Sequence, residues 1–362
     1  MKLIECYGDG RERGRAHGRA ARAEVRAAIE RWGDQLSQIH GMDPLEYAER
    51  LLSGTAFVPT IAAWAPDLAE EVRGIAEGAE LDERLILAYN LMDEQWWFDL
   101  DNYVNPGACS VLVVQPLAGS PSSSCVLAQN MDLPTFMDGS QLVLRIVPRS
   151  GAESLVLSSA GLIGLTGVNR AGVAVCVNTL LMLKHSVKGL PVAFVLRQAL
   201  SYSSLSAAAD FIERVPHASG QNYAVASSSD SISLEASGVG VTQYRSPGGD
   251  SWAHTNHPLA SADADKAVNA TPTVKSRISS SVARLQYLDA ASRKGPSPAD
   301  VKVLLADRSV PISVSPTEQH LSETFGSVVF ELSDPPGVQM CLGRPDRNDW
   351  VCLEWTDDEV HG

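Results

Sequence analysis

Apolar positions in the first hundred residues recur at the spacing of helices. Residues 10–39 are rich in Ala, Arg and Glu, with few helix-breaking residues after Gly18. A second segment places its apolar residues on one face of a helix; these are Leu68, Val72, Ile75 and Ala79. Asp82 is the expected N-cap of a further helix over 85–97. The pattern therefore predicts that this part of the chain is helical.

After residue 107 the pattern changes to short runs of β-branched and aliphatic residues, separated by turns rich in Gly and Ser. Such spacing is typical of an antiparallel meander. The predicted strands are 110–115, 125–129, 142–148, 154–158, 172–178, 222–228, 231–237, 251–256 and a group within 326–356. The helical pattern returns at 191–214, 274–291 and 298–306.

Groups of strands flanked by pairs of helices favour an α+β protein with sheets packed between helical layers. The 362 residues are enough for one large domain or two ordinary ones. Because no linker divides the chain, we expect a single domain over residues 1–362.

The composition limits the kinds of partner. The chain is 44% hydrophobic and 20% charged, as is usual for soluble proteins, and its net charge is −14. This balance argues against binding nucleic acid or an anionic membrane, because both need clustered Lys and Arg. The start of the chain has no apolar signal segment, and no run approaches 18 apolar residues. We therefore expect a cytoplasmic protein with small-molecule partners.

Six cysteines and eight histidines show neither CxxC nor paired His spacing, so no disulfide framework and no metal site are predicted. Cys109 is the exception to a purely structural interpretation of the thiols. It lies between the turn-forming Asn105–Ala108 and the strand-like Ser110–Val114. A buried core cysteine is one interpretation of this pattern, and a nucleophile at a hidden N-terminus is the other.

The second interpretation has a chemical basis. If the chain cleaves itself between Ala108 and Cys109, the new fragment begins with a thiol and a free α-amine on the same residue. The amine has a pKa of about 7.7–8.0, close to that of a thiol at about 8.5, so it can accept the thiol proton without a histidine. An internal cysteine has no such amine, so the cleavage would have to precede any activity.

A thiol that attacks acyl groups also needs donors for the developing oxyanion. Three polar clusters at strand ends are candidates, although such residues also commonly form turns. They are Gln129–Asp132, Asn178–Thr179 and His254–Pro258.

The run from Gly161 to Asn178 resembles the central signature of the penicillin acyltransferase family, the acyl-coenzyme A:6-aminopenicillanic acid acyltransferases and their relatives. Several other motifs of that family follow in the same order along the chain. They are Gly14–Gly18, Ala108–Ser110, Gln129–Asp132, Pro191–Arg197, Thr255–His257 and Ser276–Arg277. Two positions depart from the family pattern: Ala108 replaces a glycine before the cleavage point, and Met131 replaces an aromatic residue, which would alter the acyl pocket.

The resemblance implies a four-layer αββα sandwich of the N-terminal-nucleophile hydrolase type. It also implies self-cleavage into fragments 1–108 and 109–362, which stay associated. Homo-oligomers are left open.

The resemblance further implies a role for each matched residue. Cys109 would be the nucleophile, Asp132 the carboxylate that orients its amine, and Asn256 the oxyanion-hole amide. Arg277 would support Asp132 or the substrate. Substrate contacts are assigned to Asn178, Met131 and His17.

The resulting hypothesis is acyl transfer through a Cys109 thioester, from a small amide or thioester to water or an amine. No cofactor is expected, and acyl-coenzyme A is a candidate donor substrate. Two alternatives remain: a non-catalytic binding or scaffold protein of the same fold, and a papain-like site built from Cys109, Asn256 and either His254 or His257. The papain-like site would need a helix N-terminus at Cys109, where the sequence predicts a strand.

Overall fold

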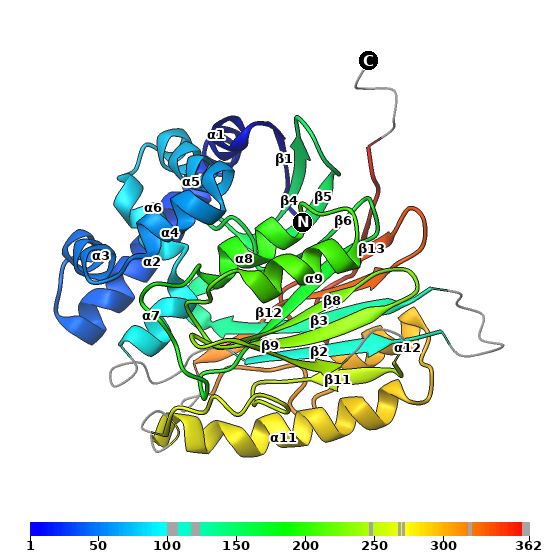
Figure 1. Cartoon of the computed structure of the whole chain (residues 1–362). Helices are drawn as coiled ribbons and strands as arrows, with labels where there is room; N and C mark the ends of the chain where they lie inside the picture. Colours follow the sequence, from blue (N-terminus) through cyan, green and yellow to red (C-terminus); the bar gives the residue numbers. More distant parts are fainter. Residues whose placement is uncertain are drawn as a thin grey trace.

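Two stacked β-sheets lie between two layers of helices in the computed structural model of the chain (Figure 1). The structure describes residues 1–99, 108–116, 124–245, 249–266, 269, 272–317 and 321–356, without the side chains of 272–274, 276 and 277. The predicted turn at 105–107 lies outside the described residues.

The eight-stranded sheet is the antiparallel meander that the sequence predicts, extended at one edge by a strand parallel to its neighbour. Its strands in spatial order are β1 (Leu3–Gly8), β4 (Gln141–Pro148), β5 (Ser154–Ser159), β6 (Thr166–Asn169), β7 (Ala174–Thr179), β8 (Gln221–Ala226), β9 (Ser231–Ala236) and β10 (Val241–Arg245). The wholly helical prediction for the first hundred residues is wrong at β1. There Ile4 and Cys6 are buried while Glu5 and Tyr7 face outward, which is the period of a strand.

The six-stranded sheet is antiparallel throughout. Its order is β11 (Trp252–His254), β2 (Ala108–Val114), β3 (Val126–Pro134), β12 (Ser322–Glu331), β13 (Gly337–Leu342) and β14 (Val351–Leu353). The pairing of β2 with β3 sets Cys109 opposite Met131 and Ala108 opposite Asp132. The predicted nucleophile and the predicted carboxylate are therefore neighbours in one hairpin.

Nine helices of the described chain lie in the layer against the eight-stranded sheet, and two more cover the six-stranded sheet (Figure 1). The nine are α1 (Gly10–Ala20), α2 (Arg22–His40), α3 (Pro44–Ser53), α4 (Phe57–Trp64), α5 (Pro66–Ala79), α6 (Glu83–Tyr89), α7 (Met92–Phe98), α8 (Val192–Ala199) and α9 (Leu205–Arg214). The other two are α11 (Pro272–Ser292) and α12 (Pro298–Leu305).

Two predicted helices are interrupted. The segment 191–214 divides into α8 and α9 because Ser204 caps a new helix through the amide of Ala207. The segment after Asp82 divides into α6 and α7, and Asp82 caps α6 as predicted, accepting from the amide of Arg84. None of the helices in the described ranges combines the length and the apolar character needed to cross a bilayer.

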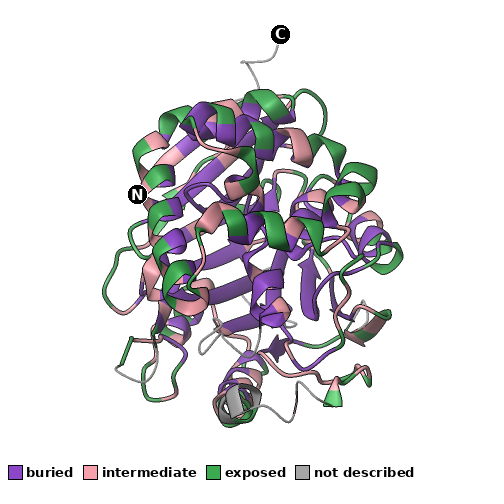
Figure 2. Ribbon diagram, turned by 90° about the vertical axis from the view of Figure 1, so that its left-hand side faces the viewer, coloured by how far each residue is buried: buried purple, intermediate pink, exposed green. Residues whose placement is uncertain are grey.

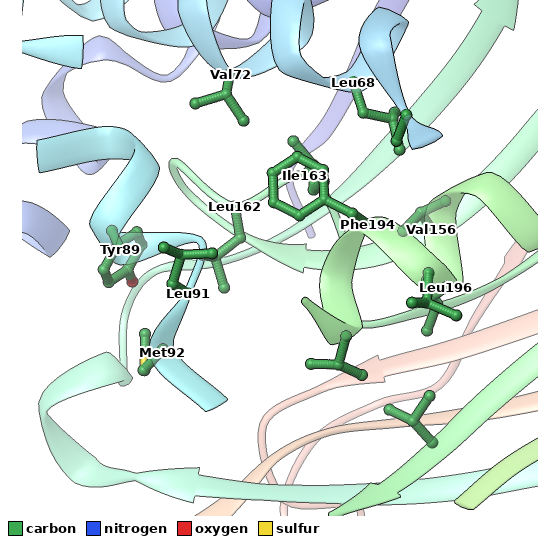
Figure 3. Close-up of a cluster of buried hydrophobic side chains, with 14 of the residues drawn as sticks. Leu68, Val72, Tyr89, Leu91, Met92, Val156, Leu162, Ile163, Phe194 and Leu196 are labelled. Carbon is green, nitrogen blue, oxygen red and sulfur yellow. The ribbon is translucent and has the colours of Figure 1, made fainter. Parts of the chain in front are cut away.

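Three hydrophobic cores separate the four layers. One lies between the helices and the eight-stranded sheet, one between the two sheets, and one between the six-stranded sheet and α11 with α12. Figure 2 shows the buried residues concentrated on the strands and on the inner faces of the helices. In the first core, Phe194 of α8 and Leu68 and Val72 of α5 lie around Ile163 (Figure 3). The expected αββα arrangement is confirmed.

Candidate active site

Cys109 is the second residue of β2 and is 6% exposed. The peptide bond between Ala108 and Cys109 therefore lies at the very start of a strand. Burial raises the pKa of the Cys109 thiol well above its ordinary value, and the carboxylates of Asp132 and Asp93 raise it further. In the uncleaved chain this thiol is consequently held neutral.

The backbone nitrogen of Cys109 is held by a side chain. β11 pairs with β2 only as far as His254 opposite Val111. Two residues after β11 ends, Oδ1 of Asn256 accepts a hydrogen bond from the Cys109 N–H at 2.8 Å, in place of a strand partner. Nδ2 of Asn256 donates to the carbonyl of Thr179 at 3.2 Å. Asn256 thus fixes the nitrogen that cleavage would turn into the α-amine.

Arg284 of α11 is the second group on Cys109, and sequence reasoning missed it. Its buried guanidinium donates to the Cys109 carbonyl at 2.7 Å and to Oγ of Ser110 at 2.9 Å. It also donates to Oδ1 of Asn256 at 2.9 Å. Because guanidinium is only a donor, this contact fixes which atom of the Asn256 amide is the oxygen.

The family resemblance assigned to Arg277 the support of Asp132 or the substrate, and the side chain of Arg277 lies outside the described residues. Arg277 and Arg284 are seven residues apart in α11, so they lie on one helix face about 10 Å apart along the axis. The signal for Arg284 was its helical spacing to Leu288 and Ser292, which are fully buried. A charged residue on the same helix face as these buried residues needs a buried hydrogen-bond or ion-pair partner, which marks Arg284 as a candidate site residue.

Asp132 is fully buried on β3 beside the start of β2. Its Oδ1 accepts from the hydroxyl of Thr324 on β12 at 2.6 Å. Asp132 and Arg284 also interact electrostatically: burial lowers the pKa of Arg284, and the charge of Asp132 opposes that change. The β2–β3 hairpin, the segment after β11 and α11 thereby bring Cys109, Asp132, Asn256 and Arg284 together.

A cavity with about 570 Å³ of empty space, open mouth included, lies beside Cys109. Its walls are mainly apolar and come from α6, α7, α8, β2, β3, β7 and the loop after β5. The larger apolar side chains are Tyr89, Met92, Trp96, Met131, Leu133, Leu162, Leu165, Val177, Val192 and Leu196. Met131, predicted to contact substrate, is therefore in the cavity wall. Figure 3 shows Tyr89, Met92, Leu162 and Leu196 in this region.

Asn178 and His17, the other two predicted substrate contacts, are not among the residues that line this cavity. Oδ1 of Asn178 accepts from Nδ2 of Asn222 at 3.0 Å, which ties β7 to β8. Nε2 of His17 accepts from the Gly161 amide at 3.1 Å, and burial lowers the pKa of His17 to about 4. Both residues therefore have structural partners.

The two histidines near Asn256 do not form a papain-like pair with Cys109. Nε2 of the buried His254 is 2.9 Å from Oε1 of Glu235, and its Nδ1 is 2.8 Å from the Thr255 carbonyl. Nδ1 of His257 is 2.7 Å from the hydroxyl of Ser281. Cys109 also lies in a strand, and among the described residues no helix begins at it, as the papain-like site would need.

Two acidic residues of α7 were also missed. Asp93 lines the cavity, and its Oδ1 accepts from the hydroxyl of Thr179 at 2.7 Å. Burial raises the pKa of Asp93 to about 6. Burial and the charge of Asp93 raise the pKa of Glu94 to about 8. Within the described residues, no group of three or more His, Cys, Asp and Glu side chains could hold a metal ion.

Comparison of the chain with known proteins shows the family to which it belongs. The family model described as acyl-coenzyme A:6-aminopenicillanic acid acyl-transferase matches residues 120–347, more than half of the chain. A curated relative from Emericella nidulans, the 40 kDa form of acyl-coenzyme A:6-aminopenicillanic-acid-acyltransferase, is 26% identical over 354 residues. That match covers 96% of this chain and 94% of the relative.

Among solved structures, a variant of conjugated bile acid hydrolase from Clostridium perfringens matches with 13% identity and a TM-score of 0.42. The match covers 70% of this chain and all of that one. Penicillin V acylase from Agrobacterium tumefaciens matches with 16% identity and a TM-score of 0.38, over 68% of this chain and 86% of that one.

The layered fold and the family match define a protein of the acyltransferase class. More particularly, the chain belongs to the acyl-coenzyme A:6-aminopenicillanic acid acyltransferase family. The matched segment begins after Cys109, so the role of Cys109 depends on the geometry around it.

Proposed function

We propose that this protein is a self-cleaving cysteine enzyme that moves an acyl group through a thioester on Cys109. The observation that carries the proposal is the position of Cys109. Its thiol lies at the wall of an apolar cavity, while Asn256 and Arg284 hold its nitrogen and carbonyl. A core cysteine would need neither the cavity nor a buried guanidinium.

Activation begins with attack of the Cys109 thiol on the Ala108 carbonyl carbon. The C–N bond to Cys109 breaks, and the Ala108 carbonyl passes to sulfur as a thioester. Water then hydrolyses the thioester, which leaves a carboxylate on Ala108 and restores the thiol on Cys109. The Cys109 nitrogen becomes a free α-amine and remains next to Oδ1 of Asn256.

This change alters the electrostatics of the thiol. In the uncleaved chain, burial and two carboxylates keep the Cys109 thiol protonated. Cleavage adds a titratable amine on the same residue, which accepts the thiol proton and then stabilises the thiolate as an ammonium. Asp132, paired with the start of β2, is placed to favour that ammonium.

In the catalytic cycle, the thiolate attacks the carbonyl carbon of an amide or thioester donor. Asn256 is the proposed oxyanion donor: its Nδ2 points to Thr179, a residue of the cavity wall. The leaving group takes the proton from the amine, and a thioester to Cys109 remains. Attack by water gives hydrolysis, whereas attack by an amine gives an N-acyl product. We assign the apolar cavity to the acyl group.

Brief exposure to activated acyl donors, such as a p-nitrophenyl ester and an acyl-coenzyme A, tests this proposal. Peptide mapping by mass spectrometry is expected to find the acyl mass on Cys109, and adding water or small amines is expected to discharge it. Cys352→Ala is the matched control, because Cys352 is the exposed thiol. An adduct that persists in Cys109→Ala, or the absence of any adduct, would favour the scaffold alternative.

A further inference from the structure

The charges in the cavity wall are all of one sign. Among the described residues that line the cavity, the carboxylates are Asp93 and Asp132, the other ionisable groups are the Cys109 thiol and the Tyr89 phenol, and there is no Lys, Arg or His. Asp132 belongs to the Cys109 hairpin, whereas Asp93 lies on α7, across the cavity. Apart from raising the pKa of the thiol in the uncleaved chain, the charge of Asp93 has no part in the acyl-transfer steps above.

The carboxylate of Asp93 is only partly satisfied by protein. Its Oδ1 accepts from the Thr179 hydroxyl at 2.7 Å and from Nε2 of Gln221 at 3.5 Å. Its other oxygen has no hydrogen-bond partner in the described part of the chain. The side chain is half-buried and faces the cavity, so a ligand there can reach it.

The surroundings of Asp93 make a cationic ligand favourable. The neighbouring groups on the cavity wall are neutral, and an ionised carboxylate among apolar side chains is costly unless it is paired. The aromatic rings of Trp96 and Tyr89 also line the cavity, and aromatic faces attract ammonium groups. An anionic ligand would instead meet two carboxylates.

We propose that Asp93 is a specificity-determining residue that selects acyl groups ending in a protonated amine over alkyl groups of the same size. This rests on the proposed function in one respect, the assignment of the cavity to the acyl group. The ammonium would pair with the free carboxylate oxygen of Asp93 while the acyl carbonyl lies at Cys109.

The test compares two isosteric probes, 5-aminopentanamide and hexanamide, which differ by an ammonium in place of a methyl group. Calorimetry on the purified protein measures the binding of both. We expect the wild type to prefer the amine by about tenfold. Asp93→Asn is expected to abolish the preference, and Asp34→Asn, an exposed acid of α2, to leave it unchanged.

Equal binding of the two probes to the wild type, or no binding of either, would overturn the proposal. So would Asp93→Asn weakening both probes equally, because that is the result of a structural role through Thr179 and Gln221. Binding does not require turnover. A preserved amine preference without any acyl adduct on Cys109 would therefore contradict the proposed function and leave this inference standing.

Discussion

Two side chains from distant parts of the sequence hold the backbone of Cys109. Asn256 accepts from its nitrogen and Arg284 donates to its carbonyl, and the two side chains are hydrogen-bonded to each other. If the preceding peptide is cut as proposed, these two contacts keep Cys109 in the same orientation. The planar guanidinium of Arg284 donates to three acceptors at once, and this fixes the position of the Cys109 backbone.

Replacing Arg284 with lysine is expected to lower the rate of acyl transfer by about a hundredfold or more, because an ammonium cannot keep the same three contacts. The rate of acyl-adduct formation on Cys109 measures the effect. Arg293→Lys, at an exposed position directly after the end of the same helix, is the matched control. If both variants react at the wild-type rate, Arg284 does not position the nucleophile.

Glu94 makes stability depend on pH in an unusual direction. Its Oε1 accepts from the Val192 amide and the Ser219 hydroxyl, and its Oε2 is buried with no partner in the described chain. The folded-state pKa of Glu94 is about 8, whereas an unfolded glutamate ionises near its ordinary value of 4.5. Between these values the folded state binds the extra proton, so this group makes the protein less stable as pH rises.

The variant Glu94→Gln is therefore expected to gain stability over the wild type between about pH 5 and pH 8, at up to about 1.4 kcal/mol per pH unit. Denaturant unfolding at several pH values measures the difference, with Glu30→Gln on the surface of α2 as control. A difference that is constant across this range would show that Glu94 does not titrate as described.

At the scale of elements, helix packing explains the motif Gly14–Gly18, the first of the motifs that resemble the family. α1 and α5 approach so closely that their glycines touch the backbone of the facing helix. A Cβ atom on Gly14 would lie 2.0 Å from the Glu71 carbonyl oxygen, and one on Gly78 would lie 2.7 Å from that of Arg15. The motif Gly14–Gly18 thus specifies a helix interface, and His17 fastens it to the turn at Gly161.

Gly14→Ala is consequently expected to destabilise the fold by about 1–3 kcal/mol, because backbone atoms cannot yield to the added methyl group. Gly240→Ala is the matched control, since a Cβ there meets nothing within 4 Å. Denaturant midpoints of the two variants provide the measurement. If both lie within error of the wild type, the close approach of α1 and α5 is not under steric constraint.

A buried glutamate on β9 holds the segment that carries Asn256. Glu235 of β9 accepts from the amides of Leu259, Ala260 and Ser261 and contacts His254. Burial raises the pKa of Glu235, but these hydrogen bonds and His254 more than offset that effect and lower it. The segment after β11 is thereby tied to the eight-stranded sheet, and the Asn256 side chain contacts both sheets, through Cys109 of β2 and Thr179 of β7.

At the scale of the whole molecule, long periodic segments were predictable, and elements defined by few residues were not. The helices and most strands follow from their spacing, whereas the six residues of β1 are followed almost at once by α1 and were included in the helical segment. Arg284 was missed because the arginine of the site was assigned from the Ser276–Arg277 motif, and only the folded chain shows that Arg284 reaches Cys109. Asp93 was missed because only the assembled layers show that α7 borders the cavity.

The proposed acyl transfer depends on cleavage before Cys109, since only a free α-amine gives the thiol its own base. The most direct test is the intact mass of the purified wild-type protein and of Cys109→Ala under denaturing conditions. We expect two chains from the wild type, residues 1–108 and 109–362, and a single uncut chain from the variant. A wild-type protein that stays at its full-length mass yet transfers acyl groups, or one cut at another bond, would contradict this expectation.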